Sequence, residues 1–320
     1  MRHLRLAVLT TAIAASFAAS PVLAQSGTVK IGFIEPLSGA IASIGQSQLN
    51  SWQVAVADAN AKKMAGGVKF EIVPFDGKGA AQESLTVLQQ IIDQGIRYVA
   101  QGTSSAVTLA LTEAISKHNE RNPGKELVFL DYAAQDPALT NERCSFWHFR
   151  FDIHADMKME ALTSYLEKKK DVKKVYLINQ DYAFGRAVNA AARKDLARKR
   201  SDVQVVGEDL HPMNQIKDFS PYVAKIKASG ADTVITGNWG PDLALMIKAA
   251  KDAGLNADFY TYNAGNAGMG AAMGSAGADR VHLIVSWHPN IDKYPGSNLA
   301  ESFREKYNQD ITNMQTCVSL

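Results

Sequence analysis

Short apolar runs alternate with longer helical patterns along most of this 320-residue chain. The first runs are VKIGFI, KFEIVPF, RYVAQ and ELVFL, which begin at residues 29, 69, 97 and 126. A helical pattern from Ser105 to His118 separates the last two. Short apolar strands that are connected through helices form parallel sheets with helices on both faces. The first part of the chain therefore predicts a doubly wound α/β lobe.

A second series of the same kind follows an interruption. The segment CSFWHFRFD (144–152) contains no turn signal, and we expect it to be a long extended crossover into a second lobe. A helical pattern at 155–168 comes next. The strands predicted after it are VYLIN, VQVVGED, DTVITG, DFYTYN and VHLIVSW, the last of them at 281–287. The segment PNIDKYPGS then predicts a return crossover, and the helix NLAESFREKYN is expected to pack on the first lobe.

These patterns predict an α/β protein with two doubly wound parallel-sheet lobes that are joined by crossovers. We expect a signal peptide at 1–24, the first part of lobe 1 at 25–147, lobe 2 at 148–287 and an incomplete return to lobe 1 at 288–320. The sequence ends at ITNMQTCVSL, in the middle of this architecture.

The N-terminal segment has the pattern of a secretory signal peptide. An apolar run at 6–19 follows Arg2 and Arg5, and a small-residue cleavage pattern ends at Ala24. We therefore expect the protein to be exported through the secretory route, with this segment removed. Without Arg2 and Arg5, the 34 lysines and arginines fall to 32 and equal the 32 acidic residues. The expected mature protein has no excess of positive charge for nucleic acid or an anionic membrane.

Two cysteines, Cys144 and Cys317, lie in a protein that is expected in an oxidising compartment. The compartment permits a disulfide, but the spacing does not decide whether the two residues pair. Neither cysteine belongs to a CxxC pair, and the seven histidines form no HExxH motif. We therefore expect no metal site and no cofactor.

One predicted loop is unusually rich in hydroxyls. Ligands of open parallel sheets bind beyond the carboxyl ends of the strands, and GTSS (102–105) is one of the loops expected there. Its Thr103, Ser104 and Ser105 precede a helix, which needs only one side-chain oxygen as a cap. Three hydroxyls at the positive end of a helix dipole predict a site for a carboxylate or another anion. A cap and a turn alone remain the simpler explanation.

Aromatic side chains occupy the corresponding loops of the second lobe. Tyr182 and Phe184 lie in NQDYAFG, Trp239 lies in GNWGP, and no apolar period explains them. Each of them alone could pack against its own helix, but three on facing loops favour a binding surface. Hydroxyls on one lobe and aromatic rings on the other suit a small organic anion with an apolar body.

Motifs for catalysis and nucleotide binding are weak or absent. The sequence contains no GxSxG nucleophile elbow and no P-loop. The glycines of AGNAGMGAAMG (264–274) are spaced GxGxxxG and lack an acidic partner at the expected distance, which disfavours a dinucleotide site. No predicted loop combines a nucleophile with its base, so we do not expect an enzyme.

The chain resembles the type I periplasmic solute-binding proteins of the branched-chain amino acid (leucine, isoleucine, valine) group, which feed ABC importers. The resemblance rests on VKIGFIEPLSGAIASIG, GIRYVAQGTSSAV, AAQDPALT, NQDYAFG and VITGNWGPDLALMIKAAKDAGL, which occur in the family's order and cover nearly all of the expected mature chain. It implies two lobes, joined by three crossovers, that close like a hinge around a ligand. Members of this family continue beyond the position of Leu320, so we expect this chain to lack a helix and closing strands and to have poor stability or impaired closure.

The resemblance also implies a ligand site. Ser105 matches a serine that holds the ligand carboxylate, Ala133 a residue whose backbone carbonyl meets the ligand ammonium, and Trp239 an aromatic residue of the second lobe. Gln135 replaces a threonine, and Asn263 stands where amino-acid binders keep a glutamate for the ammonium. A buried ammonium without a carboxylate is unfavourable, so Asn263 favours an acid without an amine. The expected ligand-binding residues are Ser104, Ser105, Ala133, Gln135, Tyr182, Phe184, Trp239 and Asn263.

We therefore expect the periplasmic substrate-binding component of an ABC importer, which binds a small carboxylate by hinge closure. The ligand is an amino acid or an aromatic or apolar acid. The expected partners are the permease, in direct contact, and the ATPase subunits, and we expect a monomer. An extracytoplasmic sensor of the same fold, which presents its ligand to a signalling receptor, is the alternative, because no motif marks either docking surface.

Overall fold

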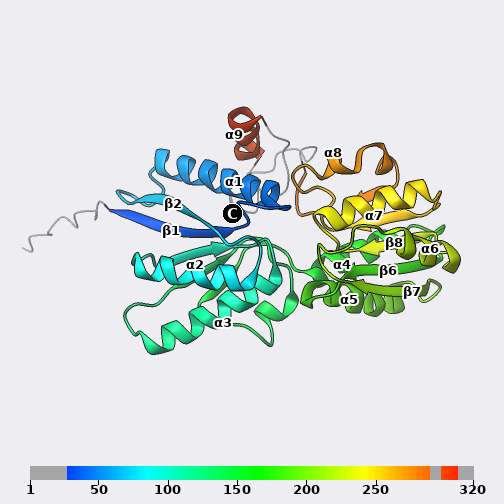
Figure 1. Cartoon of the computed structure of the whole chain (residues 1–320), viewed down its shortest axis with the longest axis horizontal. Helices are drawn as coiled ribbons and strands as arrows, with labels where there is room; N and C mark the ends of the chain where they lie inside the picture. The colour runs from blue at the N-terminus through cyan, green and yellow to red at the C-terminus, as the bar shows by residue number, and fades with distance from the viewer. Residues whose placement is uncertain (1–26, 289–296, 309–320) are drawn as a thin grey trace, which may run out of the picture.

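The computed structural model describes residues 27–288 and 297–308. These residues form two α/β lobes that lie side by side (Figure 1), each built on a five-stranded parallel sheet. The predicted fold class is confirmed. The expected signal peptide at 1–24 and the expected cysteine partner Cys317 lie outside the described residues, and Cys144 is exposed.

The first lobe has the sheet order β2-β1-β3-β4-β5. Its elements are β1 (Thr28–Glu35), α1 (Ala42–Ala61), β2 (Lys69–Asp76), α2 (Ala81–Asp93), β3 (Tyr98–Gln101), α3 (Ser105–Arg121), β4 (Val128–Asp131), the short 3-10 helix η1 (Pro137–Thr140) and β5 (His148–Arg150). Successive strand residues point to opposite faces. Phe33 accordingly packs with Trp52 of α1, whereas Ile34 packs with Ile91 of α2 and Leu111 of α3. Both faces of the sheet are covered, as its apolar strands require.

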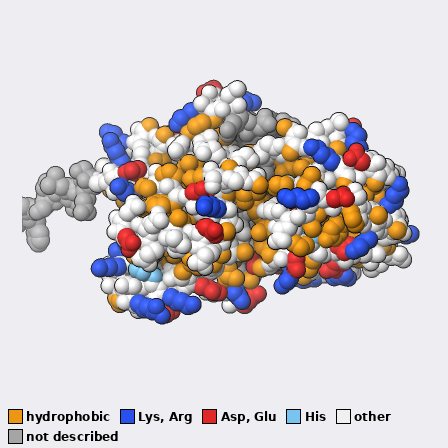
Figure 2. Space-filling model, in the orientation of Figure 1, with side chains coloured by type: hydrophobic (Ala, Val, Ile, Leu, Met, Phe, Trp, Pro, Cys, Tyr) orange, Lys and Arg blue, Asp and Glu red, His pale blue; other side chains and the backbone are white. Residues whose placement is uncertain are grey.

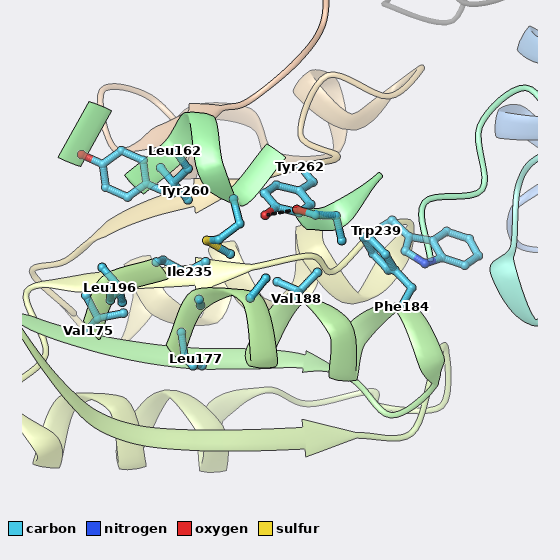
Figure 3. Packing of buried hydrophobic residues seen from close by; sticks show 14 of the residues in the cluster. Leu162, Val175, Leu177, Phe184, Val188, Leu196, Ile235, Trp239, Tyr260 and Tyr262 are labelled. Atoms are coloured by element: carbon cyan, nitrogen blue, oxygen red, sulfur yellow. Dashed lines mark hydrogen bonds between the residues drawn. The ribbon is translucent and has the colours of Figure 1, made fainter. Parts of the chain in front are cut away.

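The second lobe has the sheet order β10-β9-β8-β6-β7. Its elements are α4 (Ala155–Leu166), β6 (Lys174–Gln180), α5 (Ala183–Lys199), β7 (Gln204–His211), α6 (Ser220–Ser229), β8 (Thr233–Thr236), α7 (Pro241–Asp252), β9 (Asp258–Thr261), α8 (Met269–Met273), η2 (Gly274–Ala276) and β10 (Val281–Leu283). Leu177 faces the cluster formed with α4 and α5, and Ile178 faces the cluster formed with α6 and α7. Figure 3 shows the first of these clusters, which extends from Leu196 to Trp239 at the end nearest the first lobe.

The expected long extended segment at 144–152 is wrong. Only His148–Arg150 is a strand, and it pairs with Phe129–Asp131 of β4 in the first sheet. Because β4 is four residues long, it offers few further partners, and the chain before β5 turns through a bond from the Trp147 backbone N–H to Ser145 Oγ (3.3 Å). The first lobe therefore extends to Arg150, beyond the boundary expected at 147, and the crossover consists of residues 151–154.

The predicted strand at 281–287 is shorter in the structure. It contains only Val281–Leu283, because its partner β9 ends at Thr261. The last helix, α9 (Ser297–Tyr307), packs on α1, where the Tyr307 hydroxyl donates to Gln53 Oε1 (2.8 Å). Through this contact α9 lies against the first lobe, where the expected return of the chain would place it. Within the described part of the chain, no helix is both long and apolar enough to span a membrane.

Candidate ligand-binding site

A cleft lies between the two lobes, at the carboxyl ends of their strands. Its volume is about 430 Å³, including the part that is open to solvent. The first lobe contributes Ile44, Gln48, Gly102, Thr103, Ser105, Ala133, Ala134 and Gln135, and the second contributes Tyr182, Phe184, Trp239, Asn263 and Asn266. Seven of the eight expected site residues are among them, all except Ser104. None of these described lining residues carries a charged side chain.

Ser105 is the first residue of α3, so its hydroxyl lies at the positive end of the helix dipole. Its Oγ accepts a hydrogen bond from the Asp136 backbone N–H (3.2 Å). This bond fixes the oxygen and leaves the hydroxyl proton for a ligand. Next to it, the Ala134 N–H donates to Asp131 Oδ1 (2.8 Å), which shapes the lining loop. Burial raises the pKa of both Asp131 and Asp136.

Gln135 presents a hydrogen-bond acceptor to the cleft. Its Nε2 donates to Asp152 Oδ2 (3.1 Å), which sets the orientation of the amide. Its Oε1 is buried and has no partner among the described atoms. A buried carbonyl oxygen without a donor is unfavourable, so this atom is suited to accept a hydrogen bond from a ligand hydroxyl or amine.

The aromatic residues of the second lobe both pack and line the cleft. Phe184 and Trp239 are 3% and 5% exposed and belong to the α4–α5 cluster (Figure 3). The Trp239 Nε1–H donates to the Tyr182 hydroxyl (2.8 Å). Burial raises the pKa of Tyr182, so its phenol is neutral at physiological pH. The Tyr182 oxygen accepts this bond, and its own proton is left for a ligand.

Asn263 lies in the cleft with its amide partly engaged. Its Nδ2 donates to the Gly237 carbonyl oxygen (2.9 Å). Two acids from the same lobe are candidates to replace the glutamate of amino-acid binders, and both are engaged elsewhere. Asp242 accepts from Gln180 Nε2 (2.7 Å) and is fully buried. Asp181 forms an ion pair with Arg186 (2.7 Å). Neither of them lines the cleft.

Of the three hydroxyl residues in this loop, only Ser104 is absent from the lining of the cleft. Ser104, not Ser105, occupies the N-cap position of α3, and it makes no side-chain capping bond. Its hydroxyl is buried and has no partner among the described atoms. Thr103 lines the cleft together with Ser105. Ser105 is therefore the first residue of the helix and not its N-cap.

Behind Thr103 lies a buried carboxyl group, Glu35 at the end of β1. It is 1% exposed and accepts hydrogen bonds from the backbone N–H of Gly102 (2.7 Å) and from the hydroxyls of Thr103 and Tyr132. Both hydroxyls also lie within hydrogen-bond distance of Gln48 Oε1, at 2.6 and 2.9 Å. Burial raises the pKa of Glu35 from 4.5 to about 7, against the opposing effect of these bonds.

Six lining residues were missing from the expected set. They are Ile44, Gln48, Gly102, Thr103, Ala134 and Asn266. Thr103, Ala134 and Asn266 are neighbours of expected residues in the same loops, so a whole-loop criterion would have found them. Ile44 and Gln48 lie on α1, where one turn of a helix brings both to the cleft. Nothing in their local sequence distinguishes this surface from a core-facing one.

Known proteins share this fold and much of this sequence. A family model described as "Periplasmic binding protein" matches residues 28–317. The Leu/Ile/Val-binding protein homolog 4 of Brucella abortus (strain 2308) is 37% identical over 302 residues, 93% of this chain and 70% of that protein. The leucine-, isoleucine-, valine-, threonine- and alanine-binding protein of Brucella ovis was solved in a closed conformation. It has a TM-score of 0.81 at 31% sequence identity, and the match covers 91% of this chain and 74% of that protein. A solute-binding protein of an R. palustris ABC transporter, solved in complex with benzoate, shares the fold with a TM-score of 0.80 at 19% identity, over 92% of this chain and 78% of its own.

Proposed function

The chain belongs to the periplasmic binding protein family, and on this premise we propose that it is the substrate-binding component of an ABC importer for an aromatic or otherwise apolar carboxylic acid. The permease is its direct partner. No catalytic step is part of this function, because no base that could activate the Ser105 hydroxyl is among the described residues that line the cleft.

The observation that carries the ligand class is the distribution of donors and charges in the cleft. Ser105 on one lobe and Tyr182 on the other each keep a hydroxyl proton for a ligand, and no described lining residue is an acid. Hydrogen bonds from such donors stabilise a bound carboxylate. Burial of an ammonium without a charged partner instead costs roughly several kcal/mol of binding free energy. The aromatic rings add stacking of roughly 1 kcal/mol.

Closure of the lobes gives this site its affinity. The donors and rings lie on different lobes, so a ligand contacts all of them only when the lobes approach each other. A ligand with more contacts in the closed state shifts the population toward that state. The Brucella ovis relative was solved in a closed conformation, and the R. palustris protein holds benzoate in the same fold. The first supports a site that closes by a hinge, and the second supports an aromatic carboxylate as a ligand that this fold can hold.

We expect benzoate and 3-phenylpropionate to bind the purified protein more tightly than leucine or valine. The reason is that these acids carry the carboxylate and the ring but no amine. A thermal-shift screen followed by titration calorimetry measures the order of affinities. The des-amino acid 4-methylpentanoate is the matched control for leucine, because it differs from leucine only by the ammonium. Stabilisation by leucine without stabilisation by any of these acids would refute the proposal.

Asn263→Glu is expected to reverse part of this preference. A carboxylate at this position would repel an acid ligand and would pair with an ammonium, so benzoate affinity should fall at least tenfold and leucine affinity should rise. Calorimetry with both ligands measures the two changes. Asn263→Gln introduces a neutral side chain of the same length as glutamate, and it should leave the order of ligand affinities unchanged. Equal effects of the glutamate and glutamine variants would argue against a role of charge at this position.

A further inference from the structure

A second space lies beside the cleft, also between the lobes. It is an apolar groove of about 740 Å³, including its solvent-open part. Its walls come from the start of α1 in the first lobe and from α7 and the start of α8 in the second. Hydrophobic side chains are exposed over α7, beside the boundary between the lobes (Figure 2). Exposed apolar surface of this extent is typical of a site that binds an apolar group.

One described side chain lines both the groove and the cleft. Ile44 lines both spaces, and it packs in the same cluster as Phe184 and Trp239, which line the cleft. Ile41, one turn earlier, lines only the groove and lies against Gly240, where an added Cβ would be 3.4 Å from Ile41 Cγ2. The groove therefore adjoins the proposed ligand site at Ile44, the one described residue that lines both spaces.

The chemistry of the groove differs from that of the cleft. Its walls include Leu245, Met269 and Ala272, and Lys248 is the single charged residue among its described lining. Lys248 is exposed, so the charge lies toward solvent and the interior stays apolar. Such walls favour alkyl or aryl groups and offer little to a polar guest.

We propose that the groove is a second compartment of the ligand site and that it holds the distal apolar part of an elongated carboxylic acid. This inference rests on the proposed function, in which Ser105 and Tyr182 hold the carboxylate. The groove has one wall on each lobe, so a ligand tail there is enclosed only when the lobes close. A longer tail then favours the closed state directly, because it buries more apolar surface between the lobes.

The test is a length series of probes: benzoate, 3-phenylpropionate and 5-phenylpentanoate, measured by titration calorimetry on the full chain. Each methylene that enters the groove should tighten Kd by up to about fourfold. Ordering of the flexible chain reduces this gain, so we expect at least a tenfold gain from benzoate to 5-phenylpentanoate. An affinity that does not rise with length would overturn the groove assignment, and binding of benzoate in the same experiment would leave the proposed function standing. Binding of none of the acids would overturn both.

Two substitutions on α8 test whether the affinity gained by a longer ligand arises in the groove. Ala272→Phe fills the groove and should reduce the ratio of the benzoate Kd to the 5-phenylpentanoate Kd to about one. Ala271→Phe places the same ring on the exposed neighbouring residue, which lies outside the groove, and should keep the wild-type ratio. Leu245→Asp, on α7, introduces a charge into the groove and gives an independent check if Ala272→Phe does not fold. A wild-type ratio in a folded Ala272→Phe or Leu245→Asp protein would overturn the proposal.

Discussion

Trp239→Ala is expected to weaken the binding of 3-phenylpropionate roughly a hundredfold. The indole is 5% exposed and lines the cleft between the lobes. Truncation of a central, desolvated tryptophan typically costs roughly 2 to 4 kcal/mol of binding free energy. Two further contacts would be lost with it. The Nε1–H no longer orients the Tyr182 hydroxyl, and the first-lobe residues Ile41 and Ile44 lose a packing partner from the second lobe.

Two control variants separate binding from folding in this experiment. Trp239→Phe keeps a ring but removes the Nε1–H, so its loss of affinity should be several-fold and reflect mainly the orientation of Tyr182. Trp147→Ala removes a half-buried tryptophan that packs against the core of the first lobe, away from the cleft. It should lower the melting temperature and leave Kd unchanged. Calorimetry and thermal melts measure both effects, and a Trp239→Ala protein that binds within threefold of wild type would contradict the assigned site.

The approximate positions of strands and loops could be predicted from the sequence, because local patterns of apolar residues and turn residues determine them. A parallel sheet places loops from separate strands at one edge. Residues such as Ser105 and Trp239 therefore meet in one cleft, although 134 positions separate their numbers in the chain. Their residue types, together with the family resemblance, indicated which of these loops to expect at a ligand site. The strand boundaries at 144–152 and 281–287 were predicted less well, because the length of a ladder depends on the length of its partner strand.

The surroundings of Glu35 could not be predicted in this way. In the sequence it is the polar end of an apolar strand, VKIGFIE, which is an ordinary place for a surface residue. Its partners Gly102, Thr103 and Tyr132 are far along the chain and converge only when β1, β3 and β4 are in register. The position of Ser104 could not be predicted from the local sequence either. Its hydroxyl belongs to the same run of three in the sequence, but Ser104 is buried and does not line the cleft.

Glu35→Gln is expected to stabilise the protein at pH 8 by up to about 3 kcal/mol relative to wild type, and to have little effect at pH 5. Burial raises the pKa of Glu35 from 4.5 to about 7, so between these values the folded protein holds a proton that the unfolded chain releases. The stability linked to this proton is complete below pH 4.5 and is lost as the pH rises through 7. A glutamine is neutral at every pH and avoids this loss.

The hydrogen bonds around Glu35 suit an amide. Its oxygen could accept from the Gly102 N–H and the Tyr132 hydroxyl, as Glu35 Oε1 does. Its NH₂ group could donate to the Thr103 hydroxyl, which is then free to donate to Gln48 Oε1 at 2.6 Å. Such an arrangement reproduces the pattern of the protonated acid without a buried charge. The substitution therefore removes the titration and preserves the contacts.

Urea unfolding of wild type and Glu35→Gln at pH 5, 6, 7 and 8 measures this linkage. Other buried acids, including Asp131 and Asp136, also have raised pKa values. The informative quantity is therefore the difference between the two proteins at each pH, in which the contributions of those acids cancel. Glu71→Gln, the same change at an exposed position on the neighbouring strand β2, is the control for the loss of a carboxyl group outside this buried cluster. Because Gly102 and Thr103 line the cleft, the same pH range should also alter ligand affinity in wild type and not in Glu35→Gln. A stability difference that stays constant from pH 5 to pH 8 would mean that Glu35 does not titrate in this range in the folded protein.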